Sequence, residues 1–458
     1  MHAHLTPVSS SSDSACPARP DLPTPQAPAA AFSPAGRSPF STAPAVDAAA
    51  FDVVPDRRGT ASLKWDFAAE RGRPENVLPL WVADMDHATA PAVTNALPWR
   101  TRHGIFGYSD PDDAYNAALT GWFSRRYGWQ VEAGWNTVTP GVVPALALAV
   151  RALTAPGEAV LIEEPVYYPF REVVEDNGRT VAAVPLVRDT DGVYRRDLAA
   201  LESTIEETGS RLLLLCNPHN PVGRVWSRDE LAALDEVAAR HGVVVAADEI
   251  HADLALPGFA TTPFASLSEA TAARTITCTS PSKSFNLAGL QVANILIADA
   301  HLREAFRREL ATTGYSQPNV LGLTACRAAY EGGEAWLDAL REHIAAARAH
   351  VEARLERIEG IEAAPCEGTY LLWLDCSGFL EAAGLEPDEL DDVMLHEAGL
   401  WLDDGRIFGA GGEGFTRINV ACPRATLDAA LDRLEAAVAT VTARAGQAAR
   451  RGRVALSA

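Results

Sequence analysis

Short apolar runs alternate with helical patterns along the middle of the chain. The runs are rich in leucine and β-branched residues and are bounded by turn residues: Ala159–Ile162, Arg211–Cys216, Val243–Ala247 and Thr275–Thr279. Such runs are typical of buried strands. Between the second and third runs, Ser227 and Glu230 form a capping box at the start of a helical pattern, and Gly242 follows its end. Strands joined by helices in this way predict an α/β fold with a mostly parallel sheet.

A second pattern follows this region. The stretch from Asn319 to about Ile358 is alanine-rich and helical, with a break expected at Gly332-Gly333, and strand patterns recur at Leu371–Leu374 and Thr416–Val420. We therefore expect two lobes. We place the large domain at residues 96–325 and a smaller α/β domain at residues 51–95 and 326–442.

The two ends of the chain have a different composition. Residues 1–50 are dominated by Pro, Ser and Ala, with few large apolar side chains to offset the entropy lost on ordering, so we expect a disordered tail. No basic segment followed by an apolar one marks a secretory signal there. Residues 443–458 are expected to fray from the last helix into a basic tail.

The net charge, the hydropathy and the cysteines argue against a nucleic-acid-binding, membrane-spanning or disulfide-linked protein. Lys and Arg number 39 against 60 Asp and Glu, a net charge of −21, which argues against nucleic acid as a partner. No run of about 18 apolar residues predicts a membrane span. The seven cysteines are scattered, without a Cys-x-x-Cys pair. Free thiols fit a reducing compartment, so we expect a cytoplasmic protein.

The strongest local motif surrounds Lys283. It lies in Ser280–Gly289 (SPSKSFNLAG), directly after the run Thr275–Thr279, at the carboxyl end of a predicted strand. Ligands of parallel α/β sheets collect at these strand ends. A lysine in a partly desolvated pocket there can lose its proton and hold a carbonyl cofactor as a Schiff base. The alternative is a solvated loop lysine.

Two further motifs follow predicted strands. Asp248 comes directly after Val243–Ala247, where its carboxylate can hold the pyridine nitrogen of pyridoxal 5′-phosphate (PLP) protonated; an N-cap or a structural salt bridge is the alternative. His251 can face the same site or serve as a structural histidine. Asn220, in the turn Asn217–Gly223, can donate a hydrogen bond to a phenolate oxygen.

Two other motifs suit anionic groups. The turn in Thr139–Ala145 opens an apolar helix, and free backbone N–H groups at such a helix start suit a phosphate, although one glycine before a helix is common. Arg417 lies on a predicted strand of the second lobe, where its guanidinium can bind a substrate carboxylate through two parallel hydrogen bonds. A surface arginine is the alternative.

The chain order of these motifs resembles one superfamily. Asn220–Gly223, Asp248–His251, Ser280–Lys283 and Arg417 together resemble the fold type I, class I/II aminotransferases. Within it, four segments look like the MalY/PatB branch of carbon–sulfur β-lyases: residues 78–86, 106–108, 141–146 and 282–291. The similarity spans about residues 51–442. It implies the aspartate aminotransferase-like fold of PLP-dependent transferases.

The resemblance implies roles around the cofactor ring. Lys283 would form the Schiff base and carry protons, and Asp248 would bind the pyridine nitrogen. Asn220 and His251 would lie near the phenolic oxygen. Tyr167 would stack on the ring.

The resemblance also implies a phosphate site shared between subunits. Ser280 and the backbone amides of Val142 and Val143 would hold the phosphate. Tyr108 would reach the phosphate of a neighbouring subunit, which requires a homodimer with its active site at the interface.

For the substrate, the resemblance implies that Arg417 binds the α-carboxylate and that Asp86 lines the entrance. Two departures from the family pattern concern this pocket. Gln291 stands where many aminotransferases have an arginine that binds the phosphate, which favours the lyase branch. His87 replaces an expected aromatic residue, and a group titrating near neutrality there would alter what the pocket accepts.

The reaction implied is β-elimination. Lys283 would remove the α-proton of an amino acid that carries sulfur on its β-carbon, with L-cystathionine the leading substrate; a thiolate leaves, and pyruvate and ammonia form. An aminotransferase would use the same residues. A regulatory binding partner is the alternative from another class.

Overall fold

The main sheet carries the predicted apolar runs. A computed structural model describes residues 48–456. In this part of the chain a seven-stranded sheet has the order β2 (Asn136–Thr139), β10 (Ala293–Leu296), β9 (Thr275–Thr279), β8 (Val244–Asp248), β7 (Leu212–Cys216), β3 (Ala159–Glu164), β4 (Thr180–Pro185). The pairs from β9 to β4 are parallel, whereas β10 runs antiparallel to β9 and to β2. The predicted α/β fold with a mostly parallel sheet is confirmed.

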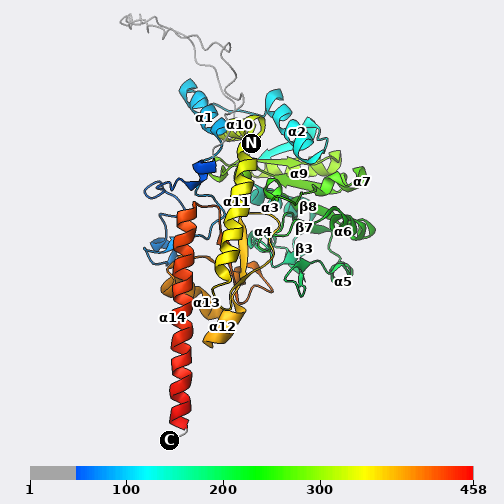
Figure 1. The fold of residues 1–458 in the computed structure, drawn as a ribbon. Coiled ribbons are helices and arrows are strands. Elements are labelled where there is room, and N and C mark those ends of the chain that lie inside the picture. The colour runs from blue at the N-terminus through cyan, green and yellow to red at the C-terminus, as the bar shows by residue number, and fades with distance from the viewer. Residues whose placement is uncertain (1–47, 457–458) are drawn as a thin grey trace, which may run out of the picture. The chain divides into compact units, whose positions relative to one another are not determined.

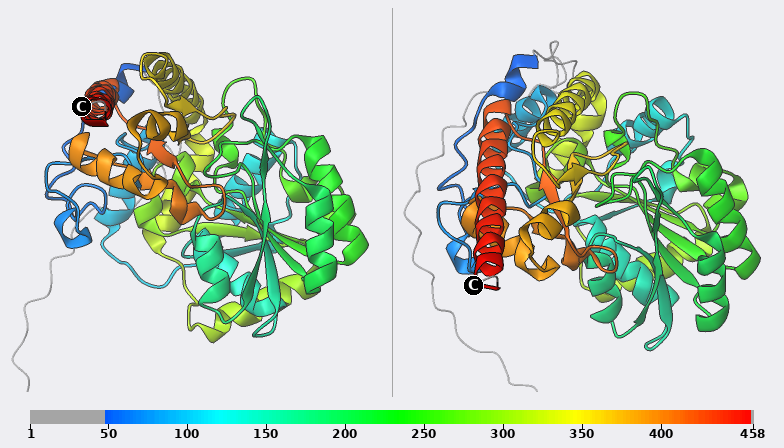
Figure 2. Two further views of the ribbon diagram at one scale, coloured as in Figure 1. Left: turned by 90° about the horizontal axis from the view of Figure 1, so that it is seen from below. Right: turned by 60° about the horizontal axis from the view of Figure 1, so that its bottom comes forward.

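Helices cover both faces of this sheet (Figures 1 and 2). Leu212 and Leu214 of β7 face a cluster with α3 (Val142–Leu153) and α4 (Pro169–Glu175), whereas Leu213 and Leu215 face a cluster with α5 (Leu198–Thr208) and α6 (Arg228–His241). This alternation follows from the two-residue period of a strand, and it explains why the run is apolar on both faces. The α-helices of the described residues are α1 (Pro91–His103), α2 (Asp113–Tyr127), α3 (Val142–Leu153), α4 (Pro169–Glu175), α5 (Leu198–Thr208), α6 (Arg228–His241), α7 (Glu269–Ala272), α8 (Pro281–Ser284), α9 (Ala300–Thr312), α10 (Val320–Gly332), α11 (Glu334–Leu355), α12 (Ser377–Ala383), α13 (Leu390–Asp392) and α14 (Arg424–Leu456).

A second sheet lies in the later part of the chain. It has the order β11 (Glu362–Ala363), β12 (Leu371–Asp375), β15 (Phe415–Asn419), β14 (Asp403–Asp404). Two short ladders accompany it: β1 (Leu78–Pro79) with β13 (Leu400–Trp401), and β5 (Val187–Arg188) with β6 (Tyr194–Arg195). The first ladder joins the N-terminal segment to this region. The division into a domain of residues 96–325 and a smaller one of residues 51–95 and 326–442 stays a prediction.

The helix ends that were predicted from capping residues and glycines are confirmed. Ser227 and Glu230 form the capping box of α6, and Gly242 ends that helix in the left-handed conformation. The break expected at Gly332-Gly333 separates α10 from α11. The C-terminal prediction is wrong: α14 continues as one helix to Leu456 instead of fraying after about Thr442, since the alanine and arginine that dominate this stretch are strong helix formers.

The remaining expectations concern the ends of the chain and membranes. Most of the tail predicted at residues 1–50 lies outside the described residues, and the described part starts with a 3-10 helix at Ala48–Asp52. Among residues 48–456, no helix combines the length and the apolar character needed to span a bilayer.

Candidate active site

A cavity of about 560 Å³ opens at the carboxyl ends of the central parallel strands. Its size falls in the range of roughly 300–1,000 Å³ typical of cofactor and ligand sites. The residues that line it come from the segment before α1, the start of α3, and the loops after β3, β7, β8 and β9: Ala83, Pro140, Gly141, Val142, Val143, Pro144, Tyr167, Cys216, Asn220, Asp248, Ile250, His251, Ser282, Lys283, Ala288 and Gln291.

Lys283 lies on this cavity because β9 ends at Thr279 and the one-turn helix α8 follows at once, capped by the side chain of Ser280. Its Nζ donates a hydrogen bond to the carbonyl of Ala83 at 2.5 Å, and the hydroxyl of Tyr370 donates to the same carbonyl at 2.9 Å. Burial lowers the pKa of the Lys283 amine to about 8. The amine therefore loses its proton far more readily than a solvated lysine.

The sequence contains one other lysine, Lys64. Its ammonium group is fully buried and paired with Asp86 at 2.8 Å and with Asp84 at 3.8 Å. Lys64 does not line the cavity, so Lys283 is the sole side-chain amine of the described residues that is available to a carbonyl ligand there.

Asp248 ends β8 with its carboxyl group at the cavity wall. Its Oδ1 accepts a hydrogen bond from the backbone N–H of Ile250 at 3.1 Å. Burial raises the pKa of Asp248 to about 7, and the amide of Ile250 and the charge of Lys283 oppose that rise. A buried carboxyl group with spare acceptor positions is suited to a cationic N–H donor, which would restore its charge.

His251 lines the same wall one turn further along. Burial and the charges of Lys283 and Arg417 hold the pKa of the His251 imidazole well below its usual range, so the ring is neutral. Its Nδ1 is buried without a hydrogen-bond partner among the described residues. The ring contacts the edge of Tyr370, with ring centroids 5.9 Å apart.

Asn220, in the loop after β7, lines the cavity and contacts Arg417 of the second sheet. The Oδ1 of Asn220 accepts a hydrogen bond of 2.8 Å from Nη1 of Arg417, which leaves the Nδ2 of Asn220 as the group that can donate to a ligand. Arg417 lies on β15 and is not itself a lining residue. Its guanidinium is buried, paired with Asp403, and hydrogen-bonded to the carbonyl of Trp81 at 3.2 Å.

The start of α3 supplies free donors. The backbone N–H groups of Val142 and Val143 line the cavity at the first turn of the helix and donate no hydrogen bond within the described residues. Such a terminus suits a phosphate. Ser280, also predicted for this role, is not a lining residue, because its hydroxyl donates to the carbonyl of Val292 at 2.7 Å; Ser282 lines the cavity instead.

The two predicted tyrosines are placed differently. Tyr167 lines the cavity, and its backbone N–H donates to the carbonyl of Asn220 at 3.0 Å. Tyr108 lies away from it, with 93% of its surface exposed, next to the exposed side chains of Ile105 and Phe106. The site of one chain therefore contains Tyr167 and lacks Tyr108.

Asp86 and His87 do not line the cavity. The carboxylate of Asp86 is buried in an ion cluster with Arg57, 2.7 Å away, and Lys64. The expectation that a neutral-titrating His87 alters the pocket is wrong: burial lowers its pKa to about 3, and its ring packs against Phe51 and His343.

The residues that the sequence motifs did not assign to the site include Ala83, Ser282 and Tyr370. Ser282 had a signal, since it adjoins Lys283. Tyr370 had none, because it approaches Lys283 from the segment before β12, in the other sheet.

Known proteins match this chain over most of its length. The family described as aminotransferase class I and II matches residues 75–434. The cystathionine beta-lyase PatB of Bacillus subtilis is 43% identical over 389 residues, 85% of this chain and 99% of that protein. The protein MalY of Escherichia coli is 34% identical over 381 residues, 82% of this chain and 96% of that protein.

The fold is similar to that of cystalysin from Treponema denticola, whose crystal structure contains a pyridoxal 5′-phosphate cofactor. The TM-score is 0.81 at 36% sequence identity, over 85% of this chain and 99% of cystalysin. The expected class of fold is thereby confirmed.

Proposed function

Because the chain belongs to the aminotransferase class I and II family, we propose that it is a PLP-dependent carbon–sulfur lyase. Its substrates are water and an amino acid with sulfur on the β-carbon, L-cystathionine or another cysteine S-conjugate, and its products are a thiol, pyruvate and ammonia. One observation carries the proposal: a low-pKa lysine, a buried carboxyl group and a helix start with free N–H groups meet in one cavity.

The lining residues fit the cofactor. Lys283 would hold it covalently, Asp248 would bind the pyridine nitrogen, and the Nδ2 of Asn220 with His251 would lie near the phenolic oxygen. Tyr167 would stack on the ring. When bound, PLP supplies an electron sink for negative charge on the substrate α-carbon.

The phosphate would lie at the start of α3. The free amides of Val142 and Val143 support this placement, and Ser282, which lines the cavity, would supply the hydroxyl group predicted from Ser280. Gln291 is uncharged, so these neutral donors and the helix dipole would hold the phosphate without a cation from Gln291.

Lys283 would then move the proton. Once the amino group of the substrate has taken its place on the cofactor, the freed amine of Lys283, with a pKa of about 8, would be a suitable general base near neutral pH and would take the proton from the substrate α-carbon. Departure of the sulfur follows readily, because a thiolate is a stable leaving group. Ala83 and Tyr370 would hold the amine beside the cavity.

Arg417 would bind the substrate α-carboxylate. Its guanidinium adjoins the cavity through Asn220, and its Nε is buried without a hydrogen-bond partner among the described residues. The ion pair with Asp403 holds the Arg417 guanidinium in place before the substrate binds.

We expect Arg417→Lys to raise KM more than it lowers kcat. Lysine keeps the charge opposite Asp403 but cannot form two parallel hydrogen bonds to a carboxylate. The loss of one charge-assisted bond implies a fall in kcat/KM of about 10- to 100-fold. Steady-state kinetics measures the split, and Arg406→Lys, at an exposed arginine paired with Asp404, is the control. An unchanged KM would remove Arg417 from carboxylate binding.

A homodimer is part of the proposal. The exposed apolar side chains of Ile105, Phe106 and Tyr108 suit burial against a second copy of the chain, where Tyr108 would contact the cofactor phosphate. A cytoplasmic location is also proposed, supported by the six described cysteines, all of which are unpaired.

The decisive experiment mixes purified holoenzyme with L-cystathionine and no keto acid. We expect pyruvate to form continuously, measured by a coupled reductase assay. An aminotransferase would need a keto-acid acceptor, and a purely regulatory protein would form no product. Pyruvate only after a keto acid is added would replace the lyase proposal with transamination.

A further inference from the structure

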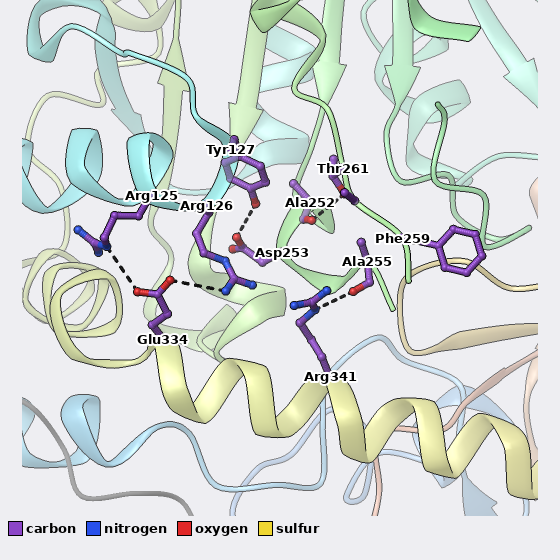
Figure 3. A pocket seen from close by; sticks show the side chains of 11 residues that line it. Arg125, Arg126, Tyr127, Ala252, Asp253, Ala255, Phe259, Thr261, Glu334 and Arg341 are labelled. Atoms are coloured by element: carbon purple, nitrogen blue, oxygen red, sulfur yellow. Dashed lines mark hydrogen bonds and ion pairs between the residues drawn. The ribbon is translucent and has the colours of Figure 1, made fainter. Parts of the chain in front are cut away.

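A second cavity, of about 220 Å³, lies outside the active site (Figure 3). Its walls are the end of α2, the first half of α11, and the segment from Ala252 to Thr261, which begins with the 3-10 helix Ala252–Leu254. Three arginines, Arg125, Arg126 and Arg341, line it with two acids, Asp253 and Glu334. Cations outnumber anions on its walls, although the chain carries a net charge of −21.

Each guanidinium retains unused donors. Arg125 donates to the carbonyl of Tyr330 at 2.8 Å and weakly to Glu334 at 3.4 Å. Its Nη1 has no hydrogen-bond partner among residues 48–456. The side chain is half exposed, so this donor can turn toward a ligand.

Arg126 and Arg341 are held in place by other groups. Both donate through Nη1 to Asp338, at 2.8 and 3.3 Å, and the Nε of Arg341 donates to the carbonyl of Ala255 at 2.7 Å. Within the described chain, the Nε and Nη2 of Arg126 and the Nη2 of Arg341 donate to nothing. In Figure 3 the two guanidinium groups point toward one another beneath Asp253.

Asp253 acts on Arg126 through its charge alone, because other groups donate hydrogen bonds to both of its oxygens. Its Oδ1 accepts hydrogen bonds from Tyr127 and, at 3.1 Å, from Trp122. Its Oδ2 accepts from Ser284 at 2.7 Å, and Ser284 directly follows Lys283. The hydrogen bonds of Asp253 therefore lie within the inner wall, and Glu334 is the lining acid that faces Arg125 and Arg126. Asp338, which does not line the cavity, pairs with Arg126 and Arg341.

From these contacts we infer that the cavity binds a small oxyanion, a carboxylate or a phosphate, between Arg125, Arg126 and Arg341. Fixed guanidinium groups with spare N–H donors match the planar or tetrahedral oxygens of such anions. The volume admits a ligand of a few heavy atoms and excludes a nucleotide. No cofactor or substrate role in the proposed reaction involves these residues.

Isothermal titration calorimetry of the PLP-loaded protein with inorganic phosphate tests this inference, because the bound cofactor fills the other phosphate site. A second titration with pyruvate shows whether the cavity binds a carboxylate more tightly than phosphate. We expect saturable one-site binding that weakens with added salt. The double variant Arg125→Gln/Arg341→Gln should weaken it by about tenfold or more, as expected for lost charge-assisted bonds.

A variant expected to tighten anion binding separates loss of the binding site from damage to the fold. Glu334→Gln removes the acid that competes for Arg125 and Arg126, so it should tighten binding, which a structural defect would not do. Arg308→Gln, at an exposed arginine of α9, should leave it unchanged. Absence of binding to the parent protein, or equal binding by all variants, would overturn the inference.

Discussion

Replacing Lys283 by alanine is expected to reduce kcat for β-elimination by about four orders of magnitude, the upper range for loss of a positioned general base. The variant also loses its covalent hold on the cofactor, since the remaining lysine, Lys64, is buried against Asp86 and does not line the cavity. Pyruvate formation from L-cystathionine, with PLP in excess, measures the loss.

The scarcity of lysine makes a direct chemical test possible. Borohydride reduction of the loaded parent protein should fix the cofactor to the peptide that contains Lys283, as peptide mass spectrometry can show, while the peptide that contains Lys64 stays unmodified as the internal control. Lys283→Ala should give no label on either peptide. Label on Lys64, or pyruvate at the parent rate from the variant, would contradict the role given to Lys283.

The part of the site that motifs predicted depends on sheet topology. Asn220, Asp248 and Lys283 follow β7, β8 and β9, and the structure brings all three to one cavity. Neighbouring parallel strands end at the same edge, so a residue placed just after each strand has little freedom to lie elsewhere. The strand pattern Thr275–Thr279 matches β9 in both bounds because its boundaries are set locally.

The part that motifs could not predict depends on contacts between distant segments. The irregular segment around Asp86 has no period that fixes the direction of its side chains, and the carboxylate turns toward Arg57 and Lys64 rather than toward the cavity. Tyr370 reaches the carbonyl of Ala83 across 287 residues of sequence. No local pattern encodes such a contact.

The second large effect is expected at Asp248. An asparagine there keeps the size of the side chain and removes the charge, so it cannot hold the cofactor's pyridine nitrogen protonated. We expect kcat to fall by about 100- to 1,000-fold, the range for loss of one electrostatic contact to charge that develops in the transition state. KM should change little, because substrate binding is assigned to Arg417, and cofactor absorbance should show the site still loaded.

The chain offers a matched control in the next residue. Glu249 is also fully buried, and burial raises its pKa to about 8. Its Oε1 accepts a hydrogen bond of 2.7 Å from the backbone N–H of Phe264, and the residue does not line the cavity. Since this carboxyl group is already largely neutral near pH 7, Glu249→Gln should keep kcat within a few-fold of the parent. Equal losses in both variants would mean that a buried polar group at this strand end acts through the fold, and that Asp248 has no special contact with the cofactor.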